Sequence, residues 1–401
     1  MTVLMTGFPG LLGSALLPRI LEGTDGTAVC LVQPKYADLA ERRLAELTGT
    51  APSVDGRIRL VLGDITMPGL GLDETSIDLA DISEIWHLAA VYDVNVERDL
   101  AVRVNVEGTR YVLDVAERCR ALERMHYFST CYVSGRYAGA FGEDDLEVGA
   151  PFSNYYEETK HRAEADVRAR MSQGLPATIY RPSIVAGDSR TGETQKFDGP
   201  YFFIQLLLRQ PGVAILPLVG EPTVTRVNVV PRDFAIDAIA HLSGLAESRG
   251  RCYHIADPSP LTVDEMIDVI AAATGRKVVR VPLPRSAAKA ALHRVPGADK
   301  VVRIPPPLID YMVHPTYYLY RPLTGRARRQ RHLVPAVSEL CRKARRVHAR
   351  TPRGDVRSYG LTAAVGRARA RSSVRMLRKP QRARSCRTPC SQPDAGSGQT
   401  A

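Results

Sequence analysis

The chain has 401 residues and an ordinary apolar fraction of 44%, enough for two domains or for one large domain with an appendage. No apolar run reaches the roughly 20 residues that span a bilayer, and a predicted strand begins almost at once, so we expect neither a transmembrane segment nor a signal peptide. Four of the seven cysteines, at positions 30, 119, 131 and 252, lack metal-ligand spacing, which favours a reducing compartment. We therefore expect a cytoplasmic protein with no metal site.

The net charge of +11 is unevenly distributed. Residues 321–401 hold 21 Lys and Arg against three acids, whereas residues 1–320 hold 33 Lys and Arg against 40 acids. The basic segment has poor apolar periodicity, so we expect either a disordered tail or a sequence read out of frame. Its single aromatic residue, Tyr359, gives base stacking little support, so a nucleic-acid partner is expected only through this tail.

Apolar runs alternate with helical patterns along the acidic part of the chain. The predicted strands are Val3–Met5, Ala28–Val32, Ile58–Leu62, Ile82–Leu88, His126–Ser129 and Ala177–Arg181. Helical patterns follow the first strand and then cover Ala37–Leu47, Leu100–Cys119 and Asn154–Met171. This alternation predicts an α/β fold, a Rossmann-type doubly wound parallel sheet with helices on both faces. Ligands of such sheets bind at the carboxyl ends of the strands.

The first strand runs directly into a glycine-rich turn. Glycines at positions 7, 10 and 13 allow a tight turn and let a pyrophosphate approach main-chain N–H groups at a helix start. A glycine triplet alone is a weak signal, and an ordinary turn is the alternative. On the dinucleotide interpretation the cofactor contacts are Gly7, Phe8, Pro9, Gly10, Leu11, Leu12 and Gly13.

The end of the second strand bears on the choice between NAD and NADP. An acid there would bind the ribose 2′-hydroxyl, but the sequence continues with Gln33 and Lys35, and Arg43 follows on the next helix. A guanidinium can bind a phosphate through two hydrogen bonds, so these residues favour NADP, with NAD as the alternative. A solvated helix face is the other interpretation of these charges. Beyond the third strand, Asp64 and Ile65 are predicted neighbours of the adenine.

A phenol and an ammonium, Tyr156 and Lys160, stand four residues apart and share one helix face. The ammonium is expected to lower the pKa of the phenol for acid–base catalysis and to reach the ribose hydroxyls. Tyr155 is off this face. A hydroxyl at the end of the fifth strand, Thr130 or Ser129, is expected to bind the substrate carbonyl.

Six motifs follow one another over residues 1–320: Thr6-Gly7-x-x-Gly10-x-x-Gly13, His87-Leu88-Ala89-Ala90, Asn105-Val106-Glu107-Gly108-Thr109, Ser129-Thr130-Cys131-Tyr132-Val133-Ser134-Gly135, Tyr156 with Lys160, and Tyr180-Arg181-Pro182. Together they make the chain resemble an extended short-chain dehydrogenase/reductase. The resemblance implies a catalytic triad of Thr130, Tyr156 and Lys160, with Pro182 beside the nicotinamide. It also implies cofactor contacts at Leu88, Ala89, Ala90, Asn105, Lys160 and Ser183.

Further motifs, including Gly63-Asp64-Ile65-Thr66 and Asn228-Val229-Val230-Pro231, resemble the thioester-reductase branch, which includes male-sterility and fatty acyl-CoA reductase-like proteins. That resemblance implies reduction of an acyl-CoA or carrier-bound thioester by NADPH to an aldehyde or alcohol. The branch commonly has Arg at the position of Gln33, whereas Arg43 matches its second arginine. The alternatives are a sugar-nucleotide epimerase or dehydratase, a hydroxysteroid-type dehydrogenase, or a non-catalytic dinucleotide sensor.

The resemblance also divides the chain. Residues 1–187 are expected to form the NADP-binding domain, to which 228–256 return, and 188–227 with 257–320 a smaller substrate-binding part. There, Thr262 is expected to cap a helix. Tyr201–Phe203 is expected to pack in a core, with an acyl channel as the alternative. His87 is expected to be structural rather than a metal ligand, and the chain is compatible with a homo-oligomer.

Overall fold

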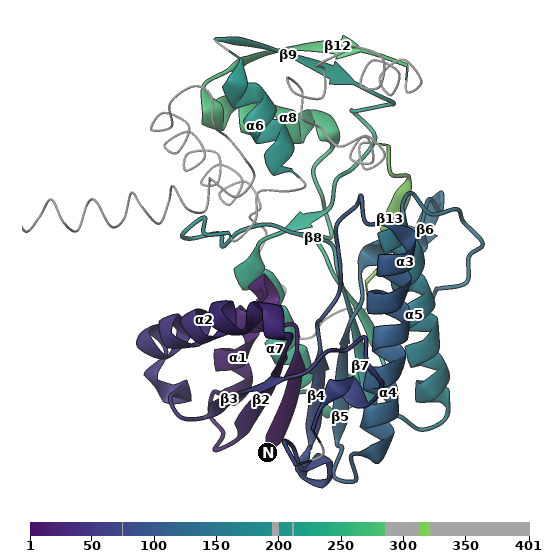
Figure 1. Cartoon of the computed structure of the whole chain (residues 1–401). Helices are drawn as coiled ribbons and strands as arrows, with labels where there is room; N and C mark the ends of the chain where they lie inside the picture. The colour runs from purple at the N-terminus through teal and green to yellow at the C-terminus, as the bar shows by residue number, and fades with distance from the viewer. Residues whose placement is uncertain (74, 195–199, 211, 285–312, 321–401) are drawn as a thin grey trace, which may run out of the picture. The chain divides into compact units, whose positions relative to one another are not determined.

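The structure, a computed structural model, describes residues 1–73, 75–194, 200–210, 212–284 and 313–320 (Figure 1). The basic tail at 321–401, with its predicted disorder or frame change, lies outside the described residues. Parts of the predicted substrate-binding segments, 195–199, 211 and 285–312, also lie outside them.

Seven parallel strands form the central sheet. In spatial order they are β3 (Ile58–Leu62), β2 (Thr27–Val32), β1 (Thr2–Thr6), β4 (Glu84–His87), β5 (Arg124–Phe128), β7 (Ala177–Pro182) and β11 (Cys252–Ile255). The order runs outward from β1 in both directions, as in a doubly wound sheet. The predicted Rossmann-type parallel fold is therefore confirmed. The seventh strand, β11, comes from the 228–256 stretch and pairs with β7.

Successive side chains of a strand point to opposite faces of the sheet and pack in two hydrophobic cores. In β1, Val3 and Met5 face the core that contains Leu17 of α1, whereas Leu4 faces the core that contains Val112 of α4. All five side chains are fully buried. A parallel sheet covered on both faces has near-continuous apolar strands for this reason.

Helices cover both faces of the sheet (Figure 1). The first face carries α1 (Leu11–Leu21), α2 (Ala37–Thr50) and α7 (Arg232–Ser243). The other carries α3 (Arg98–Ala101), α4 (Gly108–Arg118) and α5 (Tyr155–Ser172). The predicted helix over 100–119 is interrupted by a π-helical segment, Val102–Glu107, which periodicity alone does not reveal.

A separate core lies between α6 (Tyr201–Arg209) and α8 (Val263–Thr274), with the parallel pair β9 (Val213–Leu218) and β12 (Lys277–Pro282). Tyr201 and Phe203 are buried in it, so the core interpretation of this aromatic cluster is confirmed. The predicted cap of α8 is confirmed too: Thr262 and Glu265 form a capping box. Two short parallel pairs complete the described strands: β8 (Ile184–Val185) with β10 (Val229–Val230), and β6 (Gly139–Phe141) with β13 (Thr316–Tyr318).

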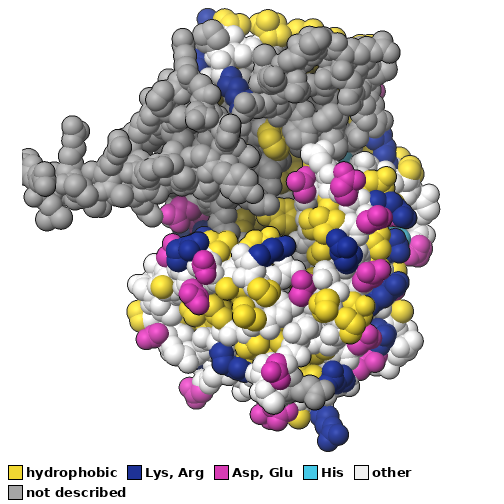
Figure 2. Space-filling view, viewed as in Figure 1, with side chains coloured by type: hydrophobic (Ala, Val, Ile, Leu, Met, Phe, Trp, Pro, Cys, Tyr) yellow, Lys and Arg dark blue, Asp and Glu magenta, His cyan; other side chains and the backbone are white. Residues whose placement is uncertain are grey.

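Charges of both signs are interspersed on the face seen in Figure 2, so the basic excess of the whole chain is not concentrated on this part of the described residues. Within the described part of the chain, no helix combines the length and apolarity needed to cross a bilayer.

Candidate active site

The glycine turn joins the end of β1 to the start of α1. Gly7 has φ +96°, and a Cβ there would lie 2.8 Å from the backbone of both Leu88 and Ala89. A Cβ on Gly10 or Gly13 would lie 2.7 or 2.8 Å from the Gly7 carbonyl oxygen. The turn therefore packs against the end of β4 in a way that only glycine permits. Helix α1 starts without a side-chain cap, which leaves its positive end available to a phosphate.

Asp64, at the end of β3, is held by hydrogen bonds. Burial opposes ionisation of this carboxyl, but donors from Thr66 and Gln33 outweigh it and lower the pKa of Asp64. Both Thr66 donors lie 2.8 Å from the carboxylate. Gln33 thus forms a hydrogen bond with the Asp64 side chain at this edge of the sheet. Ile65, the other expected adenine neighbour, is buried in the core beneath α4.

The cations expected to bind a 2′-phosphate lie beside β2. The Lys35 ammonium lies 5.0 Å from the centre of the Tyr36 ring. Arg43 donates from one terminal nitrogen to Glu46 at 2.9 Å, while its buried Nε has no hydrogen-bond partner among the described residues. An unpartnered buried guanidinium nitrogen is costly, and an anion would satisfy it.

A chain of hydrogen bonds fixes the His87-Leu88-Ala89-Ala90 segment. The Ala89 N–H donates to Thr6 Oγ1 at 3.2 Å, and Thr6 Oγ1 lies 2.7 Å from His87 Nδ1. On the other side, His87 Nε2 lies 3.0 Å from Thr109 Oγ1, which donates to the Asn105 carbonyl. These partners assign the single proton of a neutral imidazole to Nε2. Burial lowers the pKa of His87 to about 3, with a smaller effect from the Lys160 charge. The predicted structural role of His87 is confirmed.

Asn105 also acts within the protein. Its side-chain amide exchanges two hydrogen bonds with the backbone of Val91, at 2.9 and 3.0 Å, and donates to Thr159 at 3.0 Å. The amide therefore holds the segment after β4 against α5. The direct cofactor contact of Asn105 that the sequence suggests stays a prediction beside these hydrogen bonds.

Thr130 and Tyr156 meet at the carboxyl end of the sheet. Thr130 follows β5, and Tyr156 lies in the first turn of α5, which Asn154 caps through the Glu157 N–H. Burial raises the pKa of Tyr156 to about 12, partly offset by a hydrogen bond with Thr130. Thr130 also donates to the Pro182 carbonyl at 3.4 Å. Tyr155 is 44% exposed, so it is Tyr156 that joins Thr130.

Lys160 lies one turn further along α5 and is buried. Its ammonium donates to the Tyr127 hydroxyl at 2.9 Å and to the Phe128 carbonyl at 2.6 Å. Burial lowers the pKa of Lys160 to about 7, opposed by the nearby Glu164 carboxylate. The Lys160 ammonium faces β5, and burial dominates the pKa of Tyr156, so the lowering of that pKa by Lys160 stays a prediction.

A buried ion pair joins the elements that carry the predicted triad. Glu164 accepts from Ser129 Oγ at 2.5 Å and from Arg181 at 2.7 and 3.0 Å, and both charged side chains are fully buried. Ser129 precedes Thr130, Arg181 precedes Pro182, and Glu164 lies one turn after Lys160. Sequence reasoning missed this pair. In the sequence, the only indication of this pair is that two oppositely charged residues lie in elements that are otherwise expected to be buried.

Three buried polar atoms without partners among the described residues lie along the predicted cofactor path. Besides Arg43 Nε, they are Ser14 Oγ in the first turn of α1 and Ser183 Oγ after Pro182. Ser14 was not among the predicted contacts, although it directly follows Gly13. With the tight glycine turn, these atoms fit a dinucleotide with a phosphate near Arg43. Over the same described ranges, no three His, Cys, Asp or Glu side chains are grouped to hold a metal ion.

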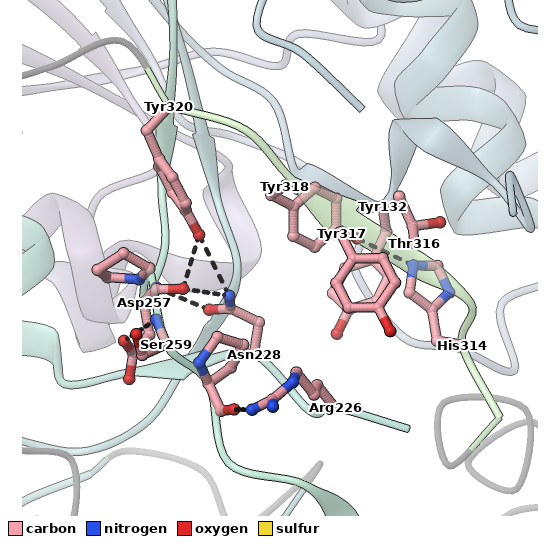
Figure 3. A pocket seen from close by; sticks show the side chains of 12 residues that line it. Tyr132, Arg226, Asn228, Asp257, Ser259, His314, Thr316, Tyr317, Tyr318 and Tyr320 are labelled. Atoms are coloured by element: carbon pink, nitrogen blue, oxygen red, sulfur yellow. Dashed lines mark hydrogen bonds between the residues drawn. The ribbon is translucent and has the colours of Figure 1, made fainter. Parts of the chain in front are cut away.

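A pocket of about 360 Å³ lies beside this centre. Figure 3 shows Asn228, Asp257 and Ser259 on one side of it and His314, Tyr317 and Tyr318 on the other. Tyr132 also lines the pocket, and its N–H donates to Thr130 Oγ1 at 3.3 Å. The pocket therefore borders the turn after β5 that Thr130 caps.

Comparison with known proteins assigns the fold and site to a family. A family model described as "Male sterility protein" matches residues 5–239, more than half of the chain. The chain belongs to the male sterility protein family. The predicted resemblance to extended short-chain dehydrogenases/reductases and to their thioester-reductase branch is confirmed, and with it the class of NAD(P)-dependent oxidoreductase.

Relatives of this male sterility family member include multidomain synthetases. It is 29% identical over 282 residues to a linear gramicidin synthase of Brevibacillus parabrevis, covering 67% of this chain and 5% of the relative. It is 24% identical over 274 residues to the fatty acyl-CoA reductase wat of Drosophila melanogaster, covering 59% and 53%. The chain thus spans only part of these curated relatives.

A solved structure with similar architecture is the terminal R domain from the myxalamid PKS-NRPS biosynthetic pathway. Its TM-score is 0.69 at 28% identity, with 87% of this chain and 90% of that chain covered. The NAD complex of UDP-glucuronic acid 4-epimerase from Bacillus cereus has a TM-score of 0.54 at 22% identity, covering 78% and 96%, a likeness of fold alone.

Proposed function

We propose that this protein reduces an acyl thioester, bound to coenzyme A or to a carrier protein, with NADPH as cofactor. The observation that carries the proposal is the meeting of the Thr130 hydroxyl and the Tyr156 phenol at the sheet's carboxyl edge. The family and the names of the relatives favour a thioester over a sugar nucleotide. NADPH rather than NADH is supported by the unpartnered Arg43 Nε and by the absence of an acid directly after β2. The four cysteines of the described residues are free and buried, which favours a reducing compartment, and we assign the protein to the cytoplasm.

In this proposal the cofactor, when bound, supplies the hydride that adds to the thioester carbonyl carbon. The chain's own residues handle the oxygen. Thr130 turns its hydroxyl proton from the Pro182 carbonyl, 3.4 Å away, to the substrate carbonyl oxygen, and Tyr156 transfers its phenolic proton to that oxygen as negative charge develops. The product of this step is a hemithioacetal. Its carbon–sulfur bond then breaks, the thiolate leaves with the electron pair and takes up the proton that the hydroxyl loses, and an aldehyde remains.

The raised pKa of Tyr156 suits this direction of the reaction. A phenol with a pKa of about 12 is fully protonated at neutral pH and can act as the acid that reduction requires. Lys160 has one N–H beyond the two that bind Tyr127 and Phe128, and we assign it to the ribose hydroxyls. Asn105 and the Glu164–Arg181 pair act as positioning residues.

The test compares two neighbouring tyrosines of α5. Tyr156→Phe should lower kcat for NADPH oxidation with an acyl-CoA thioester by about 10²–10⁴-fold, because the proton donor is lost. NADPH affinity, measured by fluorescence titration, should stay within about threefold. The control Tyr155→Phe removes an exposed hydroxyl and should match the wild type. Wild-type turnover by Tyr156→Phe would refute the assigned role.

A further inference from the structure

Tyr127, near the end of β5, carries a fully buried phenol hydroxyl that the proposed mechanism does not use. A phenylalanine would fill the same space with one polar atom fewer, and a buried hydroxyl costs free energy unless it is hydrogen-bonded. Burial, with the nearby Glu164 and Tyr156 charges, raises the pKa of Tyr127 well above its usual range. The phenol therefore keeps its proton at neutral pH, and its hydroxyl acts through hydrogen bonds rather than as an acid or base.

The first partner of this hydroxyl is the Lys160 ammonium. Lys160 Nζ lies 2.9 Å from the Tyr127 oxygen and 4.4 Å from the centre of its ring. An ammonium can only donate, so the phenol oxygen accepts. The Phe128 carbonyl accepts a second N–H at 2.6 Å. Two of the three N–H groups of Lys160 are therefore bound to adjacent residues of one strand.

The second partner fixes the direction of the phenol proton. Thr109 shares a hydrogen bond with Tyr127. The proton of Thr109 is bound to the Asn105 carbonyl, 2.7 Å away, so the phenol donates to Thr109 and accepts from Lys160. His87 Nε2, 3.0 Å from the Thr109 oxygen, supplies the other hydrogen bond to that oxygen. These partners leave the Tyr127 oxygen as an acceptor for the lysine.

The third N–H of Lys160 points away from β5. The three N–H groups of an ammonium diverge tetrahedrally, so two bonds to β5 fix the direction of the third. After burial, the Lys160 charge is the other cause that lowers the pKa of His87, so the ammonium lies near the carboxyl end of β4. Ligands of a parallel sheet bind at this edge. Lys160 also lies one turn after Tyr156, so a cofactor ribose near it is the one that carries the nicotinamide.

The same hydrogen bonds extend to the glycine turn. His87 Nδ1 lies 2.7 Å from Thr6 Oγ1, which accepts from the Ala89 N–H at 3.2 Å. A Cβ on Gly7 would lie 2.8 Å from that same Ala89 nitrogen. Helices α4 and α5, which carry parts of this chain of bonds, lie side by side (Figure 1). A variant that breaks the chain therefore has two routes to the cofactor, one through Lys160 and one through the turn, and they end at different halves of it.

We propose that Tyr127 is a positioning residue for the cofactor: its hydroxyl holds Lys160 so that the remaining N–H reaches the ribose that carries the nicotinamide. This inference rests on the proposed function, which supplies the contact between Lys160 and the ribose. In this role Tyr127 acts through Lys160 and contacts neither cofactor nor substrate. Without the hydroxyl, the ammonium would keep the Phe128 carbonyl as acceptor and would lose its single orientation, which weakens the ribose bond.

The experiment compares NADPH with adenosine 2′,5′-bisphosphate, which has the adenosine half of the cofactor and no nicotinamide ribose. Both are titrated calorimetrically into the full chain at a pH below the Lys160 pKa of about 7, so that the ammonium is charged. Tyr127→Phe should weaken NADPH binding about five- to twentyfold, because it loosens a hydrogen bond made by a charged group. Affinity for the bisphosphate should change by less than about twofold, because that ligand does not reach Lys160.

The matched control is Tyr180→Phe on the neighbouring strand β7. It removes another fully buried hydroxyl, which lies 3.0 Å from His126 Nδ1 and has no bond to Lys160. Both affinities of this variant should equal those of the wild type. Thermal unfolding of each variant establishes that it is folded at the temperature of the titration.

A double-mutant cycle separates positioning from loss of packing. In the Lys160→Met background, Tyr127→Phe should change NADPH affinity by less than about twofold, because the group that Tyr127 holds is gone. A merely structural effect of the hydroxyl would be the same in both backgrounds. The comparison of the two ligands tests the inference without Lys160→Met.

Each other outcome overturns a definite claim. Unchanged NADPH affinity of Tyr127→Phe, or an equal loss for NADPH and the bisphosphate, refutes the inference, and the equal loss assigns the hydroxyl to the support of the glycine turn. An equal loss with and without Lys160 refutes it as well. If Lys160→Met binds NADPH like the wild type, the assigned ribose contact is wrong, and the inference fails with it. Because no thioester enters these titrations, a chain that reduces none overturns the proposed substrate alone.

Discussion

The buried Glu164–Arg181 pair gives the sharpest prediction about stability. Glu164→Gln keeps the volume and one acceptor oxygen but leaves the Arg181 guanidinium buried without its counter-charge. Burial raises the pKa of Glu164, but the Arg181 charge and hydrogen bonds, with Arg168 and Ser129, outweigh it and bring the pKa to about 2. The gap from the ordinary value of 4.5 corresponds to about 3 kcal/mol. Breaking a buried pair typically costs about 3–5 kcal/mol, which agrees.

The assay is thermal unfolding followed by tryptophan fluorescence and circular dichroism. For a chain of this size, about 3 kcal/mol should lower Tm by roughly 5–10 °C. The matched control is Glu158→Gln on the same helix, whose exposed pairs with Arg98 and Arg162 are worth at most about 1 kcal/mol. Because the pKa of Glu164 is lowered by folding, its contribution is present above pH ~4.5 and lost as the pH falls towards ~2. Equal Tm changes for the two variants would refute the reasoning.

Two further predictions concern the cofactor site. Gly7→Ala should weaken NADPH binding at least tenfold and destabilise the fold by about 1–3 kcal/mol, because a Cβ would meet the backbone after β4. The control Gly23→Ala has φ +72° with open space around it, so a comparable loss there would show that φ strain alone is responsible. Folding lowers the pKa of Lys160, so the unfolded chain binds more protons than the folded one above pH ~7. The free energy of unfolding therefore rises with pH in this range. Wild type should therefore gain about 2 kcal/mol over Lys160→Met between pH 7 and 9 in urea unfolding, and parallel profiles would contradict this pKa.

Much of the nucleotide-binding fold could be predicted because its signals are local. Val3, Leu4 and Met5 form a continuous apolar run, as a strand buried on both faces requires. The glycines at 7, 10 and 13 are dictated by a turn spanning few residues, and the Thr262 cap depends on one side chain three residues away. Tyr156 was separated from Tyr155 by helical spacing alone.

Tertiary contacts decided what these residues do. Lys160 was assigned to Tyr156 by spacing, but side chains four residues apart on one helix can face different partners, and the Lys160 ammonium binds two groups of β5. Gln33 and Asp64 follow different strands, so their hydrogen bond has no sequence signature. The Glu164–Arg181 pair joins residues whose charges would ordinarily indicate solvent exposure.

The sequence by itself determined the parallel sheet, the glycine turn after β1 and the choice of Tyr156 over Tyr155, because each depends on residues within a few positions of one another. The tertiary structure raises the pKa of Tyr156 and lowers the pKa of Lys160, because distant segments bury both side chains. It also decided the polar pocket, whose walls come from stretches near 132, 228, 257 and 317. These stretches come together through the packing of strands and loops, and no local sequence pattern predicts that packing.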